Sequence, residues 1–192
     1  VYNVSNYVSG YVKAANVVFQ ANVTAYSSSN YYIYYGNPAA EAPTYSTDLS
    51  YTGGATITVQ NSHYKMTTAT DIAWLNSLIC KDYNPATELL KSTWKIFLAP
   101  VTNIGGSWHG PWESFDRNMQ VERSGPIFVD IKSVFGNWSG SGVTKGVANF
   151  RFYSRIQWFT YSSNLTLDGS NFGHLLTSSY FSLTTLQYAA YP

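Results

Sequence analysis

Charge, cysteine and long apolar runs are all scarce in this sequence of 192 residues, and each shortage excludes a class of protein. Charged residues make up 11% of the chain, against about 25% in an average soluble protein, and the net charge is +1. No basic surplus is available to hold a nucleic acid or an anionic membrane. Polar residues, proline and glycine interrupt every charge-poor stretch, so we expect neither a transmembrane helix nor a secretory signal peptide.

The one cysteine, Cys80, narrows the choice further. It excludes an intrachain disulfide framework and any zinc site built on several cysteines. A free thiol in a Leu-Ile-Cys segment is usually a core residue, so we expect Cys80 to be buried. The histidines His63, His109 and His174 are far apart in sequence and form no metal-binding motif, so we expect no metal and no cofactor.

Aromatic residues are what the chain has in abundance. They make up 17% of it, led by 17 tyrosines, which excludes intrinsic disorder. The few charges are unevenly spread: residues 1–40 carry only Lys13 and residues 156–192 only Asp168. Either hydroxyl and amide groups keep these ends wetted, or the ends are strands covered by the core, by other copies of the chain or by a partner.

Short β-branched and aromatic runs, separated by Gly, Pro, Asn and Ser, predict an all-β antiparallel β-sandwich formed as one domain over residues 1–192. The predicted strands are Asn16–Tyr26, Tyr31–Tyr35, Ala55–Gln60, Thr93–Ala99, Met119–Glu122, Ile127–Val134, Val147–Tyr153, Arg155–Tyr161 and Tyr180–Tyr191.

Alternation assigns faces to two of these stretches. It places Ile127, Val129 and Ile131 on one face of their strand. Across 147–158, it directs Phe150, Phe152, Ile156 and Trp158 inward, and Arg151, Tyr153, Arg155 and Gln157 outward.

One segment predicts a short helix on a loop. In residues 70–79, a Thr70 or Asp71 N-cap precedes Ile72, Leu75 and Ile79 at helical spacing. A second helical turn is expected to start at Pro85, because proline suits the first helical position.

No catalytic motif is present, and we expect no enzyme. The sequence lacks a G-x-S-x-G nucleophile elbow and a phosphate-binding loop. A jelly-roll glycosidase needs two carboxylates across a sugar-binding cleft, and in that family they are glutamates inside strands. Of the glutamates Glu41, Glu88, Glu113 and Glu122, only Glu122 lies in a predicted strand. This glycosidase stays the least favoured alternative.

Two aromatic clusters are the candidate receptor- or ligand-binding sites. Trp108, His109 and Trp112 lie in a predicted loop rich in glycine and proline, where a tryptophan either anchors the loop in the core or contacts a ligand. Tyr32 and Tyr34 belong to the run Tyr31-Tyr32-Ile33-Tyr34-Tyr35, of which alternation exposes one pair. Four N-glycosylation sequons begin at Asn3, Asn22, Asn137 and Asn164.

The C-terminal sequence Asn171-Phe-Gly-His-Leu-Leu-Thr-Ser-Ser-Tyr-Phe181, followed by Leu183–Tyr191, resembles the closing strand of adenovirus fibre heads, in particular the avian type. The Thr-Leu-Trp-Thr opening of mammalian fibre heads is missing. The ending Tyr191-Pro192 is nearly as similar to the head of a reovirus attachment protein. The resemblance implies a homotrimeric antiparallel β-sandwich at the tip of a spike. It carries over no catalytic residue and no receptor contact.

The sequence therefore predicts a viral attachment protein on the virion surface. We expect it to be a homotrimer that binds a host cell-surface protein or glycan, and neither binds nucleic acid nor inserts into a membrane. The alternative is a secreted, extracellular, lectin-like module that binds carbohydrate.

Overall fold

The computed structural model describes residues 1–6, 11–36, 39, 41, 44–70, 72–90, 96–97, 101–104, 107–109, 116–136, 143–167 and 174–176. This part of the chain is all-β and antiparallel and contains no helix, hence no helix able to span a membrane. The chain divides into two compact units, residues 1–46 and 47–192. The single domain predicted over residues 1–192 stays a prediction, and the sandwich itself is formed by the second unit.

The first unit contains one short antiparallel hairpin, strands β1 (Tyr2–Asn6) and β2 (Val12–Asn16). Residues 17–36 form no strand, so the strands predicted over Asn16–Tyr26 and Tyr31–Tyr35 are wrong. Their β-branched and aromatic residues favour extended backbone but have no neighbouring strand to bond with there, and strand propensity depends on such neighbours. Local contacts hold the segment instead: the Tyr31 hydroxyl donates to the Asn22 carbonyl oxygen at 3.0 Å, and Phe19 lies against Tyr31.

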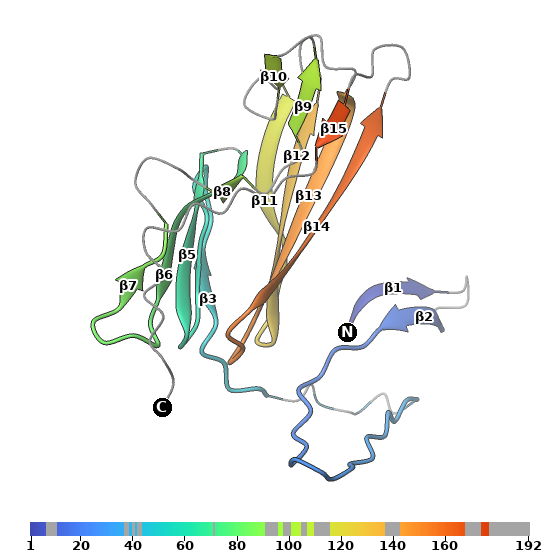
Figure 1. The fold of residues 1–192 in the computed structure, drawn as a ribbon. Helices are drawn as coiled ribbons and strands as arrows, with labels where there is room; N and C mark the ends of the chain where they lie inside the picture. Colours follow the sequence, from blue (N-terminus) through green and yellow to red (C-terminus); the bar gives the residue numbers. More distant parts are fainter. Residues whose placement is uncertain are drawn as a thin grey trace. The chain divides into compact units, whose positions relative to one another are not determined.

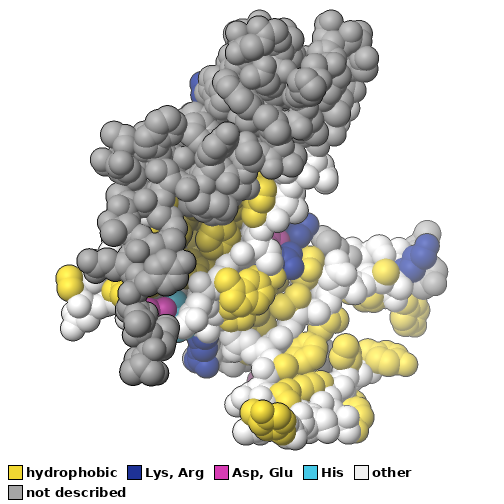
Figure 2. Space-filling model, in the orientation of Figure 1, with side chains coloured by type: hydrophobic (Ala, Val, Ile, Leu, Met, Phe, Trp, Pro, Cys, Tyr) yellow, Lys and Arg dark blue, Asp and Glu magenta, His cyan; other side chains and the backbone are white. Residues whose placement is uncertain are grey.

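Large apolar side chains of the first unit are exposed, as Figure 2 shows in yellow. Tyr32 is 73% and Tyr34 is 90% exposed. The N-terminal segment is expected to be buried, either in the core or between subunits, and its own unit does not bury it. Burial between subunits stays a prediction. The predicted strand Tyr180–Tyr191 lies outside the described residues.

The second unit begins with an antiparallel sheet of six strands (Figure 1). Its order is β3–β4–β5–β6–β7, and β8 also pairs with β6. The strands are β3 (Ser50–Thr52), β4 (Thr58–Gln60), β5 (Tyr64–Ala69), β6 (Ile72–Cys80), β7 (Thr87–Glu88) and β8 (Ile96–Phe97). The predicted strand Ala55–Gln60 is confirmed in its second half by β4, and β8 lies within the predicted Thr93–Ala99.

The helix predicted over residues 70–79 is wrong, because this segment is the long strand β6. Its register with β5 shifts at two places, so that Thr67 pairs with Ser77 but Thr68 pairs with Leu75. The extra residue, Asn76, lets Leu75 and Leu78 both pack toward the core although they are three positions apart. The helical turn expected at Pro85 is also wrong: residues 81–85 form bends, and strand β7 follows them.

A second sheet is a four-stranded meander in the order β11–β12–β13–β14, the yellow-to-orange strands of Figure 1. The strands are β11 (Asp116–Ser124), β12 (Phe128–Gly136), β13 (Val143–Tyr153) and β14 (Phe159–Leu167). They confirm three predictions closely: Met119–Glu122, Ile127–Val134 and Val147–Tyr153.

The two sheets share one hydrophobic core, which makes the fold sandwich-like. The strands of the six-stranded sheet and the residues directly beside them contribute Leu49, Ile57, Val59, Tyr64, Met66, Leu75 and Leu90. The four-stranded sheet contributes Met119, Val129, Ile131, Phe135, Ala148, Phe150 and Phe152. The alternation of apolar residues along β12 and β13 accounts for the second set apart from Met119, which lies in β11.

A small antiparallel sheet completes the described strands. It consists of β9 (Val101–Ile104), β10 (Ser107–His109) and β15 (His174–Leu176), with β9 in the middle. The predicted loop around Trp108 and His109 is therefore a strand at these positions, pairing with Asn103 and Thr102.

Candidate functional site

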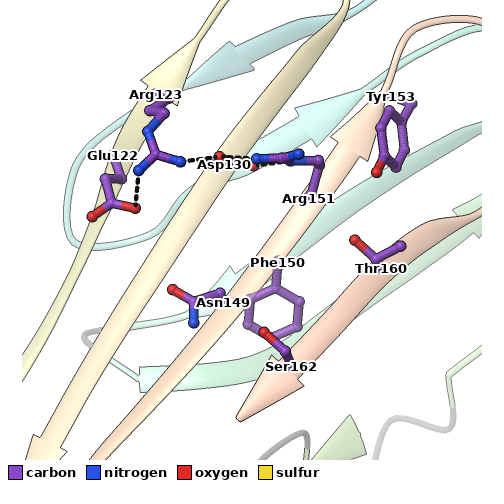
Figure 3. A pocket seen from close by; sticks show the side chains of 9 residues that line it. All are labelled: Glu122, Arg123, Asp130, Asn149, Phe150, Arg151, Tyr153, Thr160 and Ser162. Carbon is purple, nitrogen blue, oxygen red and sulfur yellow. Dashed lines mark hydrogen bonds and ion pairs between the residues drawn. The ribbon is translucent and has the colours of Figure 1, made fainter. Parts of the chain in front are cut away.

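The outer face of the four-stranded sheet carries a groove of about 320 Å³, seen from close by in Figure 3. All four strands line it, through Glu122, Arg123, Asp130, Asn149, Phe150, Arg151, Tyr153, Thr160 and Ser162. Its volume lies at the lower end of the range of ~300–1,000 Å³ for small-molecule sites. Nearly all of its lining is polar, which distinguishes it from the usual apolar pocket.

The strand register places three charged residues of the groove in one row across the sheet. Asp130 lies opposite Arg123 on one side and opposite Arg151 on the other. Arg151 donates to both carboxylate oxygens of Asp130, from Nε at 2.7 Å and from Nη2 at 2.8 Å, and Arg123 Nη1 donates at 3.2 Å. Such bidentate pairing is strong and fixes both side chains, so the floor of the groove is rigid.

A β-bulge brings a second carboxylate to the same face. Val121 pairs with Ile131 and Arg123 pairs with Asp130, so Glu122 is the extra residue between them. A bulge re-aims a side chain, and Glu122 here reaches Lys132 at 3.0 Å and Arg123 at 3.7 Å. The guanidinium of Arg151 also lies 4.3 Å from the centre of the Phe128 ring.

The other half of the groove is polar but uncharged. Asn149 of β13 pairs with Ser162 of β14, and Arg151 pairs with Thr160, so these side chains form two adjacent rows. Amide and hydroxyl groups both donate and accept hydrogen bonds. The groove therefore offers a charged wall, formed by Glu122, Arg123, Asp130 and Arg151, and a neutral hydrogen-bonding wall, formed by Asn149, Thr160 and Ser162.

A second pocket, of about 250 Å³, lies where β5 begins, β6 ends and β14 begins. Its lining is mainly aromatic and aliphatic, with few polar groups: His63, Tyr64, Leu78, Cys80, Asp82, Leu89, Gln157, Trp158 and Phe159. We call it the Trp158 pocket. His63 Nδ1 lies 2.9 Å from Asp82 Oδ1, within hydrogen-bond distance. Cys80 is half-buried rather than in the core, which corrects the expectation for this thiol.

Trp158 is 55% exposed, although alternation predicts it to point inward with Phe150 and Phe152. The strand predicted over Arg155–Tyr161 is interrupted: residues 154–155 form a turn, and β14 starts only at Phe159. Arg155 has a φ of 60°, which is uncommon for a residue other than glycine, and this turn resets the alternation.

Two polar residues hold this turn. Asp48 accepts hydrogen bonds from the Ser154 hydroxyl at 2.7 Å, from the Arg155 amide at 2.8 Å, and from the amide and hydroxyl of Ser62. Burial raises the pKa of the Asp48 carboxyl, but the hydrogen bonds from Ser62, Ser154 and Arg155 outweigh it and hold this pKa well below its usual range. Asn61, which is buried, donates to the carbonyl oxygens of Tyr153 and Ile156.

The described residues that line the two hollows include none of the residues that the sequence predicts as binding residues. Tyr32 and Tyr34 are exposed in the first unit. Trp108 and His109 lie in β10, and Trp112 lies outside the described residues. Their role in binding stays a prediction. Among the described residues, no three His, Cys, Asp or Glu side chains are placed to hold a metal ion.

Sequence reasoning missed the groove for one reason and the Trp158 pocket for another. Alternation does place Arg151 and Tyr153 on the outer face, and the adjacent charges Glu122 and Arg123 are the signal of a bulge. The Trp158 pocket has no local signal, because a turn held by distant residues creates it.

Comparison of this chain with known protein families, curated proteins and solved structures found no match.

Proposed function

We propose that this chain is the receptor-binding head of a viral attachment spike, and that its receptor binds in the groove on the outer face of the four-stranded sheet. One observation carries the proposal: a rigid sheet presents a concave, almost wholly polar face. The resemblance of the C-terminal sequence to fibre heads supplies the viral context.

The ion pairs of the two carboxylates in the groove support binding rather than catalysis. A glycosidase needs one carboxyl group as an acid and a second as a base or nucleophile. In the groove, Asp130 is engaged through both oxygens by Arg151, and Glu122 by Lys132 and Arg123. Carboxylates paired in this way are occupied as hydrogen-bond acceptors. Should Glu122→Gln abolish hydrolysis of a chromogenic glycoside, the glycosidase alternative would replace our proposal.

The composition of the groove favours a polar receptor surface. Its ion-paired cluster contains Arg123, Lys132 and Arg151 against Glu122 and Asp130, so cations exceed anions by one. Charged groups at the edge of an interface mainly speed the association of the two partners and fix their relative orientation. The amide and hydroxyl wall offers directional hydrogen bonds. A host cell-surface glycan or a polar loop of a host protein both suit this arrangement.

Assembly into a homotrimer is the part of the proposal that is tested first. The first unit carries a single formal side-chain charge before Glu41 and exposes most of its large apolar side chains, which other copies of the chain would cover. Sedimentation velocity at micromolar concentration is expected to give a trimer. A strict monomer would contradict the attachment-spike proposal.

The groove is tested by blocking its neutral wall. We expect fluorescently labelled wild-type protein to stain some lines in a panel of cultured cells. Ser162→Arg, which fills the groove, should abolish the staining. Asn164→Arg is the matched control, because Asn164 is also exposed, lies two residues along β14 and does not line the groove. Equal staining by wild type and Ser162→Arg would exclude the groove as the receptor site.

The second candidate function is a secreted lectin-like module that acts as a monomer. The Trp158 pocket favours it, because an exposed tryptophan beside a few polar groups suits a sugar. A monomeric protein that binds one sugar specifically on a glycan array would support this alternative.

A further inference from the structure

We propose that the Trp158 pocket is a binding site for one neutral hexopyranose ring. This deepens the proposed function, on which its biological meaning rests, by naming a second contact site and a ligand class. The argument depends on the shape of the pocket, its polar groups and the way its walls are held.

The shape fits a flat ring with one apolar face. A pyranose presents C–H groups on one face and hydroxyl groups around its edge. The Trp158 indole is 55% exposed and packs edge-on against Tyr153, with ring centres 5.2 Å apart, so it is held in place yet open to a ligand. The volume of about 250 Å³ lies below the range of ~300–1,000 Å³ for drug-sized ligands, which favours a single ring over an oligosaccharide.

The polar groups suit hydroxyls. With His63 Nδ1 bonded to Asp82 Oδ1, the remaining carboxylate oxygen Oδ2 and ring nitrogen Nε2 have no partner in the described part of the chain. Gln157 adds an amide to the same lining. Two hydroxyl groups of a sugar can donate to a carboxylate, whereas the carboxylate of an acidic sugar would be repelled by Asp82. The ligand class is therefore a neutral sugar.

The walls are held in place before any ligand binds. The side-chain oxygen of Asn61 accepts hydrogen bonds from the backbone amides of His63 and Tyr64. Its side-chain nitrogen donates to the carbonyl oxygens of Tyr153 and Ile156. One buried side chain thus links the wall that bears His63 to the wall that bears Trp158. Asp48 bridges the same two turns through Ser62 and Ser154. A preformed site loses less entropy on binding than a flexible one.

The strained backbone is an independent sign of a site here. Arg155, with its φ of 60°, lies three residues before Trp158, and its amide donates to Asp48. A residue other than glycine keeps a positive φ only where the surrounding contacts hold its backbone in that conformation. Such residues cluster at ligand-binding sites.

The test is saturation-transfer NMR on the purified wild-type chain with methyl glycosides of galactose, glucose and mannose, and with N-acetylneuraminic acid as the acidic comparison. We expect at least one neutral glycoside to bind with a millimolar dissociation constant, and the acidic sugar to bind more weakly. Absence of binding by every neutral glycoside, or preference for the acidic sugar, would overturn the proposal.

Three variants locate the site. Trp158→Ala should weaken binding at least about tenfold, and Asp82→Asn, which preserves shape, should also weaken it. Tyr83→Ala is the matched control, because Tyr83 is 52% exposed but does not line the pocket, and its affinity should stay within about twofold of wild type. Thermal unfolding checks that the Asp82→Asn and Trp158→Ala variants are folded. If both folded variants bind the sugar with the affinity of the wild type, this pocket is not the binding site.

The two proposals fail separately. A trimer whose cell staining depends on Ser162 but which binds no neutral sugar contradicts only the sugar site. A monomer that binds a sugar through Trp158 contradicts the attachment spike and retains the site.

Discussion

The two compact units of this chain are both rich in aromatic residues but place them oppositely. In the sandwich, Phe135, Phe150 and Phe152 are at most 1% exposed. In residues 1–46, Tyr32 and Tyr34 are largely exposed. The difference lies in pairing: the buried phenylalanines belong to strands whose neighbours satisfy the backbone, whereas the tyrosines belong to a segment with no strand beside it. A high aromatic content shows that the chain has much apolar surface that could be buried. Whether a single chain buries this surface depends on the pairing of its strands.

The largest effect should come from cutting into the sandwich core. Phe150→Ala should lower the free energy of unfolding by about 3–5 kcal/mol, because it leaves a cavity among Phe152, Phe159 and Tyr161. Denaturation by urea measures the change. A loss below about 1 kcal/mol would mean that the core is far looser than the contacts indicate.

A smaller loss is expected from overfilling the same core. A Cβ atom at Gly146 would overlap the ring of Phe135, so Gly146→Ala should cost about 1–3 kcal/mol. Gly125→Ala is the control, because a Cβ atom there meets no atom within 4 Å. Equal melting temperatures of the two variants would contradict the close approach of Gly146 to Phe135.

The hydrogen bonds of Asp48 should make the sandwich sensitive to acid. The pKa of this carboxyl is lower in the folded chain than the value of about 3.9 expected when unfolded, so the unfolded state binds more protons as the pH falls. Its stabilisation is present above about pH 4 and is lost as the pH falls further.

Asp48→Asn isolates this contribution. The difference in unfolding free energy between wild type and Asp48→Asn should be largest near neutral pH, at about 1–3 kcal/mol, and shrink toward pH ~2. Urea denaturation across this pH series measures it. A difference that is constant over the series would show that the Asp48 carboxylate does not titrate with folding.

The smallest effect on stability is expected in the first unit. Tyr32→Ser with Tyr34→Ser should change the unfolding free energy of the chain by no more than about 0.5 kcal/mol, because both side chains are already exposed. In sedimentation, the same variant should associate more weakly than wild type. A large loss of stability in the monomer would reverse the comparison between the units.

Much of the sandwich follows from local pattern. Alternation through Val129, Ile131, Phe150 and Phe152 predicts both the strands and their inward faces. The error at residues 70–79 arises because Ile72, Leu75 and Ile79 have helical spacing, whereas the pairing of this segment with β5 joins it to a sheet. The charged wall of the groove is also partly predictable, since Arg151 faces outward by alternation, but its pairing with Asp130 requires the register of β12 with β13.

The sequence by itself determined the fold class, the polar outer face of the meander and the scarcity of charge at the N-terminal end. All three features depend on side chains that are close together in the sequence. In a strand, the side chains of every second residue lie on the same face of the sheet. Tertiary structure alone decided the exposure of Trp158 and the row Arg123–Asp130–Arg151. The turn before Trp158 is held by Asp48 and Asn61, which lie roughly a hundred residues earlier in the chain. Hydrogen bonds between such distant residues leave no periodic trace in the sequence.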